Sequence, residues 1–217
     1  MELIIGNKNY SSWSLRAWLM LRAFDLPFNE VRLALFEDDF YKRINDYTSA
    51  GKVPVLIDGD IKVWDSLAIC EYINEALLDG KAWPTDIGQR AHARAIVSEM
   101  HSGFMALRRE LPMNCRATRK INITADAQKD IDHIDKMWSN LREEHKAIGP
   151  WLFGKLTIAD IFYAPVALRF AGYQIALSAQ SEGYINTILT YPPIQAWVED
   201  SKLETEVIET EEVGLAV

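Results

Sequence analysis

The chain has 217 residues, of which 49% are hydrophobic and 25% charged, a composition typical of a globular protein with a sizeable core. Its 23 basic and 31 acidic residues give a net charge of −8, which disfavours nucleic acid or an anionic membrane as the main partner. No apolar run has the length of a membrane span and no signal peptide is apparent, so we expect a soluble cytoplasmic protein. The two cysteines, Cys70 and Cys115, are expected to be buried reduced thiols.

The first part of the chain, to about residue 77, mixes strand and helix signals. The apolar run 3–6 predicts a buried strand, and a serine-rich stretch then leads into the apolar helical segment 17–24. Further along, the pattern predicts a strand at 28–33, a loose helix at 40–47, a β-hairpin at 53–64 and a helix from Asp65 to about residue 76. This order predicts a small mixed sheet, parallel in its first pair, with helices on its faces.

Strand signals nearly vanish after residues 78–86, which contain Gly80 and Pro84 and are predicted to form a linker. Apolar spacing predicts helices at 93–107, 131–141 and 157–170 and a short helix after Pro192, the first of them ended or kinked by Pro112. We therefore expect an all-helical second part, residues 87–217. The acidic C-terminal residues, with no basic residue after Lys202, are predicted to be a mobile solvated tail.

The stretch from Tyr10 to Arg16 contains three serines where a predicted strand gives way to a helix. A serine oxygen can accept a hydrogen bond from the free amides of the first helical turn, so helix capping alone could explain it. The same position also favours an anion, because unpaired N–H groups and a partial positive charge meet there.

Two other short motifs could border the same edge of the sheet. Val53-Pro54 stands at the head of a strand, where a trans proline is the simpler interpretation, and a cis bond would present the Val53 backbone to an extended peptide. Asp65-Ser66 begins a helix, where the pair either caps the helix or holds the ammonium and carboxylate groups of an amino acid.

The remaining motifs predict structure rather than chemistry. Thr157 to Asp160 matches a helix capping box. His92, His101, His133 and His145 lack metal-ligand spacing, so we expect solvated helix-face histidines and no metal site.

Together these motifs resemble the cytosolic glutathione transferase family over nearly the whole chain. Residues 11–16 are similar to the serine loop of its zeta-type members, which include maleylacetoacetate isomerases. Residues 51–56 resemble the segment with the family's cis-proline, residues 65–69 its acidic-serine pair, and residues 154–160 its capping-box signature. The resemblance implies a thioredoxin-like domain over residues 1–77, an all-helical domain over residues 87–217, and a homodimer.

The resemblance also implies that glutathione, as co-substrate, lies along the first domain. The Val53 backbone at Pro54 would pair with its cysteinyl part, Asp65 and Ser66 would hold its γ-glutamyl end, and Lys52 could reach a carboxylate. A loop hydroxyl would donate to the sulfur: the zeta-type pattern matches Ser11, the theta-type pattern Ser12, and tyrosine-using members place a tyrosine near Tyr10. We expect Ser11 first and Ser12 second.

Trp13 replaces the cysteine usual in zeta-type members, which puts isomerase activity in doubt and places a bulky ring beside the electrophile. Candidate residues of the electrophile pocket are Met100, Phe104, Met105 and Arg108, with Tyr10 nearby. Three functions follow: conjugation of glutathione to a small hydrophobic electrophile, cis–trans isomerisation of a maleyl-type keto acid with Arg16 and Arg108 as the available cations, and a non-catalytic binding module on the same fold.

Overall fold

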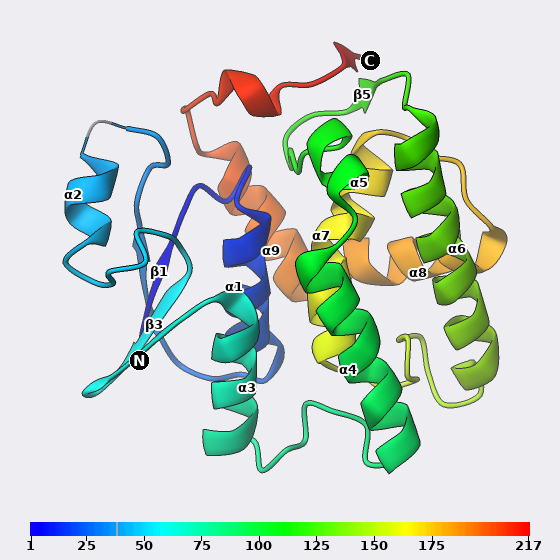
Figure 1. Ribbon diagram of the computed structural model, residues 1–217, viewed down its shortest axis with the longest axis horizontal. Helices are drawn as coiled ribbons and strands as arrows, with labels where there is room; N and C mark the ends of the chain where they lie inside the picture. The colour runs from blue at the N-terminus through cyan, green and yellow to red at the C-terminus, as the bar shows by residue number, and fades with distance from the viewer. Residues whose placement is uncertain (38) are drawn as a thin grey trace.

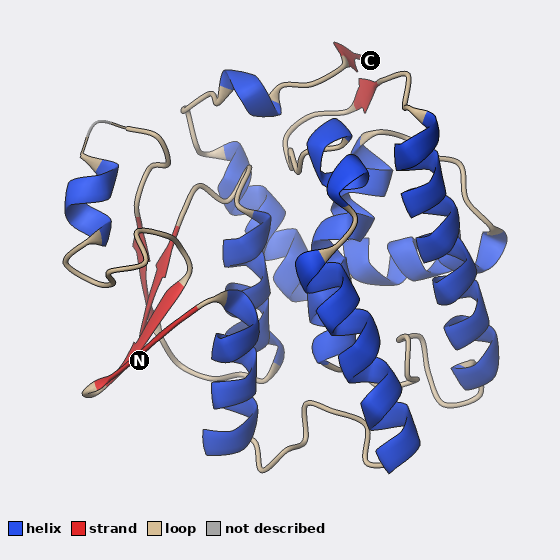
Figure 2. Cartoon of the chain, viewed as in Figure 1, coloured by secondary structure: helices blue, strands red, loops and turns tan. Residues whose placement is uncertain are grey.

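The computed structural model describes residues 1–37 and 39–217. A four-stranded sheet lies at one side of the molecule, and helices fill the rest (Figure 1, Figure 2). The main hydrophobic core continues from one face of the sheet into the helices. The architecture is therefore a thioredoxin-like α/β part joined to a second part that is helical apart from one short pair of strands.

The sheet contains β1 (Glu2–Ile5), β2 (Asn29–Arg32), β3 (Val55–Asp58) and β4 (Ile61–Trp64) in the order β2-β1-β3-β4. β1 pairs parallel with β2 and antiparallel with β3, and β3 and β4 form the predicted hairpin. Alternation along β1 sends Leu3 and Ile5 to the main core and Ile4 to a smaller cluster with Phe40. Helices α1 (Ser12–Ala23) and α3 (Ser66–Ala76) cover the first face, and α2 (Phe40–Ile44) covers the second.

The helical part is built around α7 (Ile158–Gly172), which is buried on all sides between α1, α4 (Ile87–Ser102) and α8 (Ala179–Leu189) (Figure 1). Its apolar sequence on every face fits this central place. The predicted capping box is present: Thr157 caps α7 and the Asp160 side chain accepts from the Thr157 amide at 2.8 Å. The other helices are α5 (Met105–Glu110), α6 (Ala125–His145) and α9 (Pro192–Lys202).

Three expectations about the helical part need correction. The predicted helix 93–107 is two helices, because α4 ends at Ser102, Gly103 caps it, and Phe104 adopts a left-handed conformation with φ 57° before α5. Helix α8 was not predicted, because its sequence mixes polar and apolar residues without a clear period. His145 is buried against Phe153 rather than solvated.

The C-terminal residues are not a mobile tail. They fold back over the molecule as a short 3-10 helix, η1 (Glu209–Glu211), and a strand, β6 (Leu215–Ala216), which pairs with β5 (Arg119–Lys120) (Figure 1). Ile208 is buried, and Arg119 forms an ion pair with Glu212. The acidic C-terminal segment keeps this position because Arg116 and Arg119, which follow α5 in the chain, bind its carbonyl and carboxylate oxygens. Composition alone does not reveal these contacts.

Candidate functional site

A cavity of about 910 Å³ opens where the end of β1 meets α5, α7 and the C-terminal segment. Its walls come from seven separate stretches of the described chain: residues 10–13, residues 35–36 with 40–41, residues 50–54, residues 64–66, Met105 with Arg108, Arg169, and the C-terminal residues Ile208 and Glu211. The serine stretch, Val53-Pro54 and Asp65-Ser66, which are far apart in sequence, thus line one cavity.

Ser11 is the N-cap of α1. Its Oγ accepts from the Ser14 amide at 3.3 Å and its hydroxyl donates to Ser14 Oγ at 2.7 Å, while Ser14 Oγ accepts from the Gly6 amide at 3.0 Å. Both the hydroxyl proton and the oxygen of Ser11 therefore form hydrogen bonds within the first turn of the helix. The capping role that the sequence suggested belongs to Ser11.

Ser12, the first residue of α1, has a different environment. Its Oγ accepts a hydrogen bond from Nη2 of Arg169, on α7, at 3.1 Å, and the side chain is buried at the cavity wall. No acceptor for the Ser12 hydroxyl is present in the described residues. A hydroxyl that accepts from a guanidinium is a stronger donor, so Ser12 has a polarised proton to offer to an anion at the helix N-terminus.

Trp13 packs against two arginines and a histidine beside the serines. Its ring lies 4.6 Å from the Arg16 guanidinium, 4.9 Å from that of Arg108 and 5.4 Å from the His101 ring. Arg16 is sandwiched between Trp13 and Phe162, whose ring centre is 4.4 Å away. Because Trp13 is 36% exposed and lines the cavity, its outer face is open to a ligand.

Arg16, Arg108 and Arg169 are held close together without a carboxylate partner within 4.0 Å in the described part of the chain. Burial, reinforced by the neighbouring guanidinium groups, lowers the pKa of Arg16 to about 9 and that of Arg169 to about 10, and burial also lowers the pKa of Arg108. The first two values lie above 7, so these two arginines stay charged at neutral pH. The Glu211 carboxylate offsets part of this effect at Arg169, and the positive charge that remains favours an anion in the adjoining cavity.

The Val53–Pro54 peptide bond is cis, as the resemblance implied and contrary to the simpler trans interpretation. Val53 and Pro54 line the cavity just before β3, and Lys52 is exposed at its rim. Within residues 1–37 and 39–217, no hydrogen bond involves the amide or carbonyl of Val53. These two backbone groups remain available to an extended ligand.

Asp65 caps α3 and adopts φ 75°. Its Oδ1 accepts from the Leu67 and Ala68 amides at 2.8 and 3.3 Å, and its Oδ2 lies 3.1 Å from Nε2 of His101. Burial lowers the pKa of His101, although Asp65 opposes this effect. Ser66 is 1% exposed, lines the cavity, and has no hydrogen-bond partner for its hydroxyl among the described residues. A buried unpaired hydroxyl costs stability unless a ligand satisfies it.

The Tyr10 hydroxyl is already fully engaged. It donates to Glu212 Oε1 at 2.6 Å and accepts from Nη2 of Arg116 at 3.0 Å and from the Ile208 amide at 3.4 Å. Burial and the Glu212 carboxylate raise its pKa. Tyr10 therefore ties the C-terminal segment to the serine stretch and offers no proton to a ligand.

The predicted electrophile pocket is only partly in place. Arg108 and Met105 line the cavity, but Met100 and Phe104 do not. Met100 lies on the buried face of α4, and Phe104 is buried at the break between α4 and α5. Sequence reasoning missed Arg169, Ile208 and Glu211. The one available signal for Arg169 was an arginine within the largely apolar run 161–170, and nothing in the sequence indicated the C-terminal residues.

Within the described residues, no group of three or more histidine, cysteine, aspartate or glutamate side chains could hold a metal ion. In the same residues, no helix has the length and apolar character needed to cross a membrane.

Comparisons with family profiles, known sequences and solved structures all point to the same protein family. The profile of the glutathione S-transferase N-terminal domain matches residues 10–76, and that of the C-terminal domain matches residues 90–200. Glutathione S-transferase Z1 of Arabidopsis thaliana is 29% identical over 174 residues, covering 73% of this chain and 74% of that protein. Glutathione S-transferase Z2 of the same plant is 30% identical over 172 residues, with 73% and 74% covered.

The holo structure of maleyl pyruvate isomerase, described as a bacterial zeta-class glutathione S-transferase, superposes with a TM-score of 0.72 at 17% identity. It covers 95% of this chain and 100% of that one. This likeness supports the fold, and the two domain profiles establish the family. The chain belongs to the glutathione S-transferase family of enzymes and is similar to its zeta-type members.

Proposed function

We propose that this enzyme binds glutathione along residues 1–77, joined by a linker at 78–86 to a helical domain at 87–217, and activates its thiol for attack on a small electrophile. The observation that carries the proposal is the buried Ser12 hydroxyl at the start of α1, which accepts from Arg169 and has a free proton. The sequence favoured Ser11 as the donor, but its hydroxyl is committed to Ser14, so we assign thiol activation to Ser12 and capping to Ser11.

Each part of glutathione has matching groups around the cavity. The unpaired amide and carbonyl of Val53 suit the cysteinyl backbone. The unpaired Ser66 hydroxyl and the Asp65 carboxylate suit the carboxylate and ammonium of the γ-glutamyl end. Lys52 at the rim can meet the remaining carboxylate, and the exposed face of Trp13 can cover the ligand.

The arginines and the helix N-terminus supply the electrostatics of activation. A free thiol with a pKa of about 8.5 is only a few per cent thiolate at neutral pH. A hydrogen bond from Ser12, worth about 1.5–3 kcal/mol when one partner is charged, lowers that pKa by roughly 1–2 units. The thiolate then forms a carbon–sulfur bond with the electrophile, whose leaving group departs with the electron pair, and the thiol proton goes to solvent.

The test compares Ser12→Ala with Ser11→Ala in conjugation of glutathione to an aryl halide as a function of pH. We expect Ser12→Ala to shift the pH dependence of kcat/KM upward by one to two units and Ser11→Ala to lower stability by about 1 kcal/mol with a smaller shift. Equal pH profiles for wild type and Ser12→Ala would remove the assignment. Retention on immobilised glutathione without any conjugation would favour the non-catalytic binding module.

The arginine group favours a second candidate within the same chemistry, the cis–trans isomerisation of a maleyl-type keto acid. Two buried guanidinium groups, those of Arg16 and Arg169, and the partly buried one of Arg108 carry more positive charge than a single thiolate would balance. This excess suits a substrate that carries carboxylates. The thiolate would add to the conjugated double bond, which allows rotation about the resulting single bond. Loss of the thiolate would then re-form the double bond as the trans isomer and release free glutathione thiolate. Turnover of maleylacetone supports this candidate, and its absence alongside aryl halide conjugation removes it.

We also propose a cytoplasmic homodimer. Free Cys70 and Cys115, both with a raised pKa because of burial, suit a reducing compartment. The half-exposed side chains of Ile61 and Trp64 on β4 suit a surface that a second copy covers. Light scattering at working concentration tests the dimer.

A further inference from the structure

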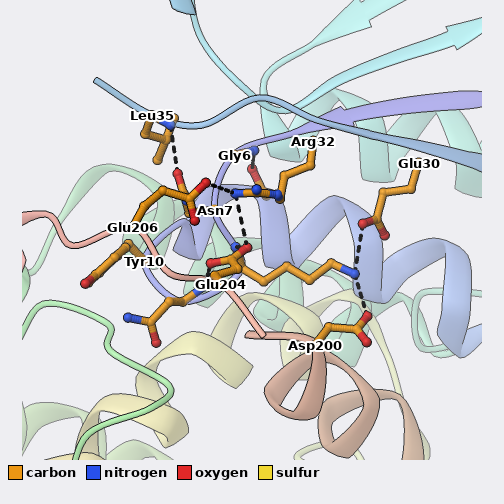
Figure 3. Close-up of polar contacts among 12 residues, drawn as sticks. Gly6, Asn7, Tyr10, Glu30, Arg32, Leu35, Asp200, Glu204 and Glu206 are labelled. Atoms are coloured by element: carbon orange, nitrogen blue, oxygen red, sulfur yellow. Dashed lines mark hydrogen bonds and ion pairs between the residues drawn. The ribbon is translucent and has the colours of Figure 1, made fainter. Parts of the chain in front are cut away.

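The loop that leads to the serines is hydrogen-bonded to the Glu204 carboxylate of the C-terminal segment. Glu204 accepts from the Lys8 amide at 2.6 Å through Oε1 and from the Asn9 amide at 3.0 Å through Oε2. Figure 3 shows this carboxylate directed at the loop, with Tyr10 and Asn7 beside it. Its side chain is only 6% exposed, so water is a poor substitute for either bond.

These two amides lie in the turn that leads directly to the serines. Within it, the Tyr10 and Ser11 amides donate to the Asn7 carbonyl at 3.3 and 2.8 Å, and the Ser12 amide donates to the Tyr10 carbonyl at 2.9 Å. The Lys8 and Asn9 amides point the other way and have Glu204 as their partner. A shift at residues 8–9 therefore changes the position of Ser11 and Ser12.

The segment that carries Glu204 is itself fixed. Arg116 donates to the carbonyls of Glu204 and Glu206, the latter at 2.9 Å, and to the Tyr10 hydroxyl at 3.0 Å. Arg32 pairs with Glu206 at 2.8 Å. Glu204 is thus presented to the loop in a set position, and the contacts span almost 200 residues of sequence.

We propose that Glu204 is a positioning residue for thiol activation: by holding the amides of Lys8 and Asn9, it places the Ser12 hydroxyl at the thiol. The proposal rests on the proposed function, because it concerns the same thiolate. Glu204 acts through the loop. The structure gives its carboxylate no role as a ligand contact, since it does not line the cavity.

The direction in which Glu204→Gln shifts the pKa of the bound thiol distinguishes a positioning role from a purely electrostatic one. A negative charge near a thiolate destabilises it, so if charge alone mattered, Glu204→Gln would lower the pKa of the bound thiol. If positioning matters, the same change raises that pKa, because the amide cannot accept both backbone N–H groups and the loop relaxes.

The experiment titrates the ultraviolet absorbance of the glutathione thiolate bound to wild type, Glu204→Gln, Glu204→Asp and the exposed control Glu209→Gln. We expect Glu204→Gln to raise the thiol pKa and lower kcat about tenfold with little change in KM for glutathione, Glu204→Asp to recover part of the loss, and Glu209→Gln to match wild type. Arg116→Gln, which frees the same segment, serves as a second variant if Glu204→Gln does not fold.

A wild-type pKa below that of free glutathione, left unchanged or lowered further in Glu204→Gln, overturns this inference and leaves the proposed function intact. A wild-type pKa equal to that of free glutathione overturns the proposed function and this inference with it.

Discussion

Replacing Arg16 by methionine tests whether the buried positive charge of this side chain lowers the stability of the fold. Arg16 is 1% exposed, and its Nε and Nη1 have no hydrogen-bond partner among the described residues. Its stabilising contacts are the rings of Trp13 and Phe162. The side chain therefore carries a buried charge that the fold itself does not compensate.

The cost of that charge follows from its pKa. Burial and the guanidinium groups of Arg108 and Arg169 lower the pKa from 12.5 to about 9, and at about 1.4 kcal/mol per unit this corresponds to roughly 5 kcal/mol against the charged form. Arg16→Met removes the penalty but loses two cation–π contacts of about 1–2 kcal/mol each. We expect a net gain in unfolding free energy of roughly 1–3 kcal/mol, since buried ions replaced by apolar side chains often stabilise.

The assay is urea unfolding at pH 7 and at rising pH. Because the folded-state pKa lies below the unfolded one, the penalty is fully present below pH 9 and is relieved as pH rises from about 9 towards 12.5. The advantage of Arg16→Met should therefore shrink above pH 9. Arg22→Met, on the same helix and also stacked on two rings but exposed, is the matched control and should gain nothing. A loss of stability in Arg16→Met, or a difference independent of pH, would refute this reasoning.

Three further predictions concern single groups. Asp160→Asn should destabilise by about 2–4 kcal/mol in urea unfolding, because four donors converge on its two oxygens and an amide can accept at only one of them. His101→Gln should make stability less sensitive to acid: burial lowers the folded-state pKa of His101, so the unfolded chain takes up the proton first and wild type loses stability as pH falls below 6.5. Arg169→Lys should shift the pH profile of conjugation to higher pH in the wild-type background. It should have little further effect in Ser12→Ala, because both changes remove the same hydrogen bond between Arg169 and Ser12.

Each of these has a contrary result. Asp160→Asn at wild-type stability would mean that the carboxylate is not needed for the capping box. An acid response identical in His101→Gln and wild type would place the pKa of His101 at its ordinary value. Additive effects of Arg169→Lys and Ser12→Ala would show that the arginine acts independently of the hydroxyl.

Local signals in the sequence predicted most of the α/β part and several elements of the helical part. The serine stretch, the Asp-Gly hairpin turn and the capping box at Thr157 each depend on residues within a few positions, so their chemistry can be read directly. The apolar run at residues 3–6 and the 3.6-residue period of α4 and α6 likewise predicted buried side chains.

The contacts between distant segments could not be predicted in this way. Arg169 meets Ser12 across 157 positions, and Glu204 meets Lys8 across 196, so no spacing in the sequence relates them. The tail was assigned as mobile from its acidic composition, but its order depends on Arg116 and Arg119, which the fold brings opposite to it. The choice between Ser11 and Ser12 depends on hydrogen-bond partners, which only the structure supplies.

The central claim is that Ser12 donates to a glutathione thiolate at the start of α1. Its most direct test is titration of the thiolate absorbance of bound glutathione in wild type, Ser11→Ala and Ser12→Ala. The account predicts a wild-type pKa below that of the free thiol, a rise of roughly 1–2 units in Ser12→Ala, and a smaller rise in Ser11→Ala. An unchanged pKa in Ser12→Ala, or a larger rise in Ser11→Ala than in Ser12→Ala, would contradict it.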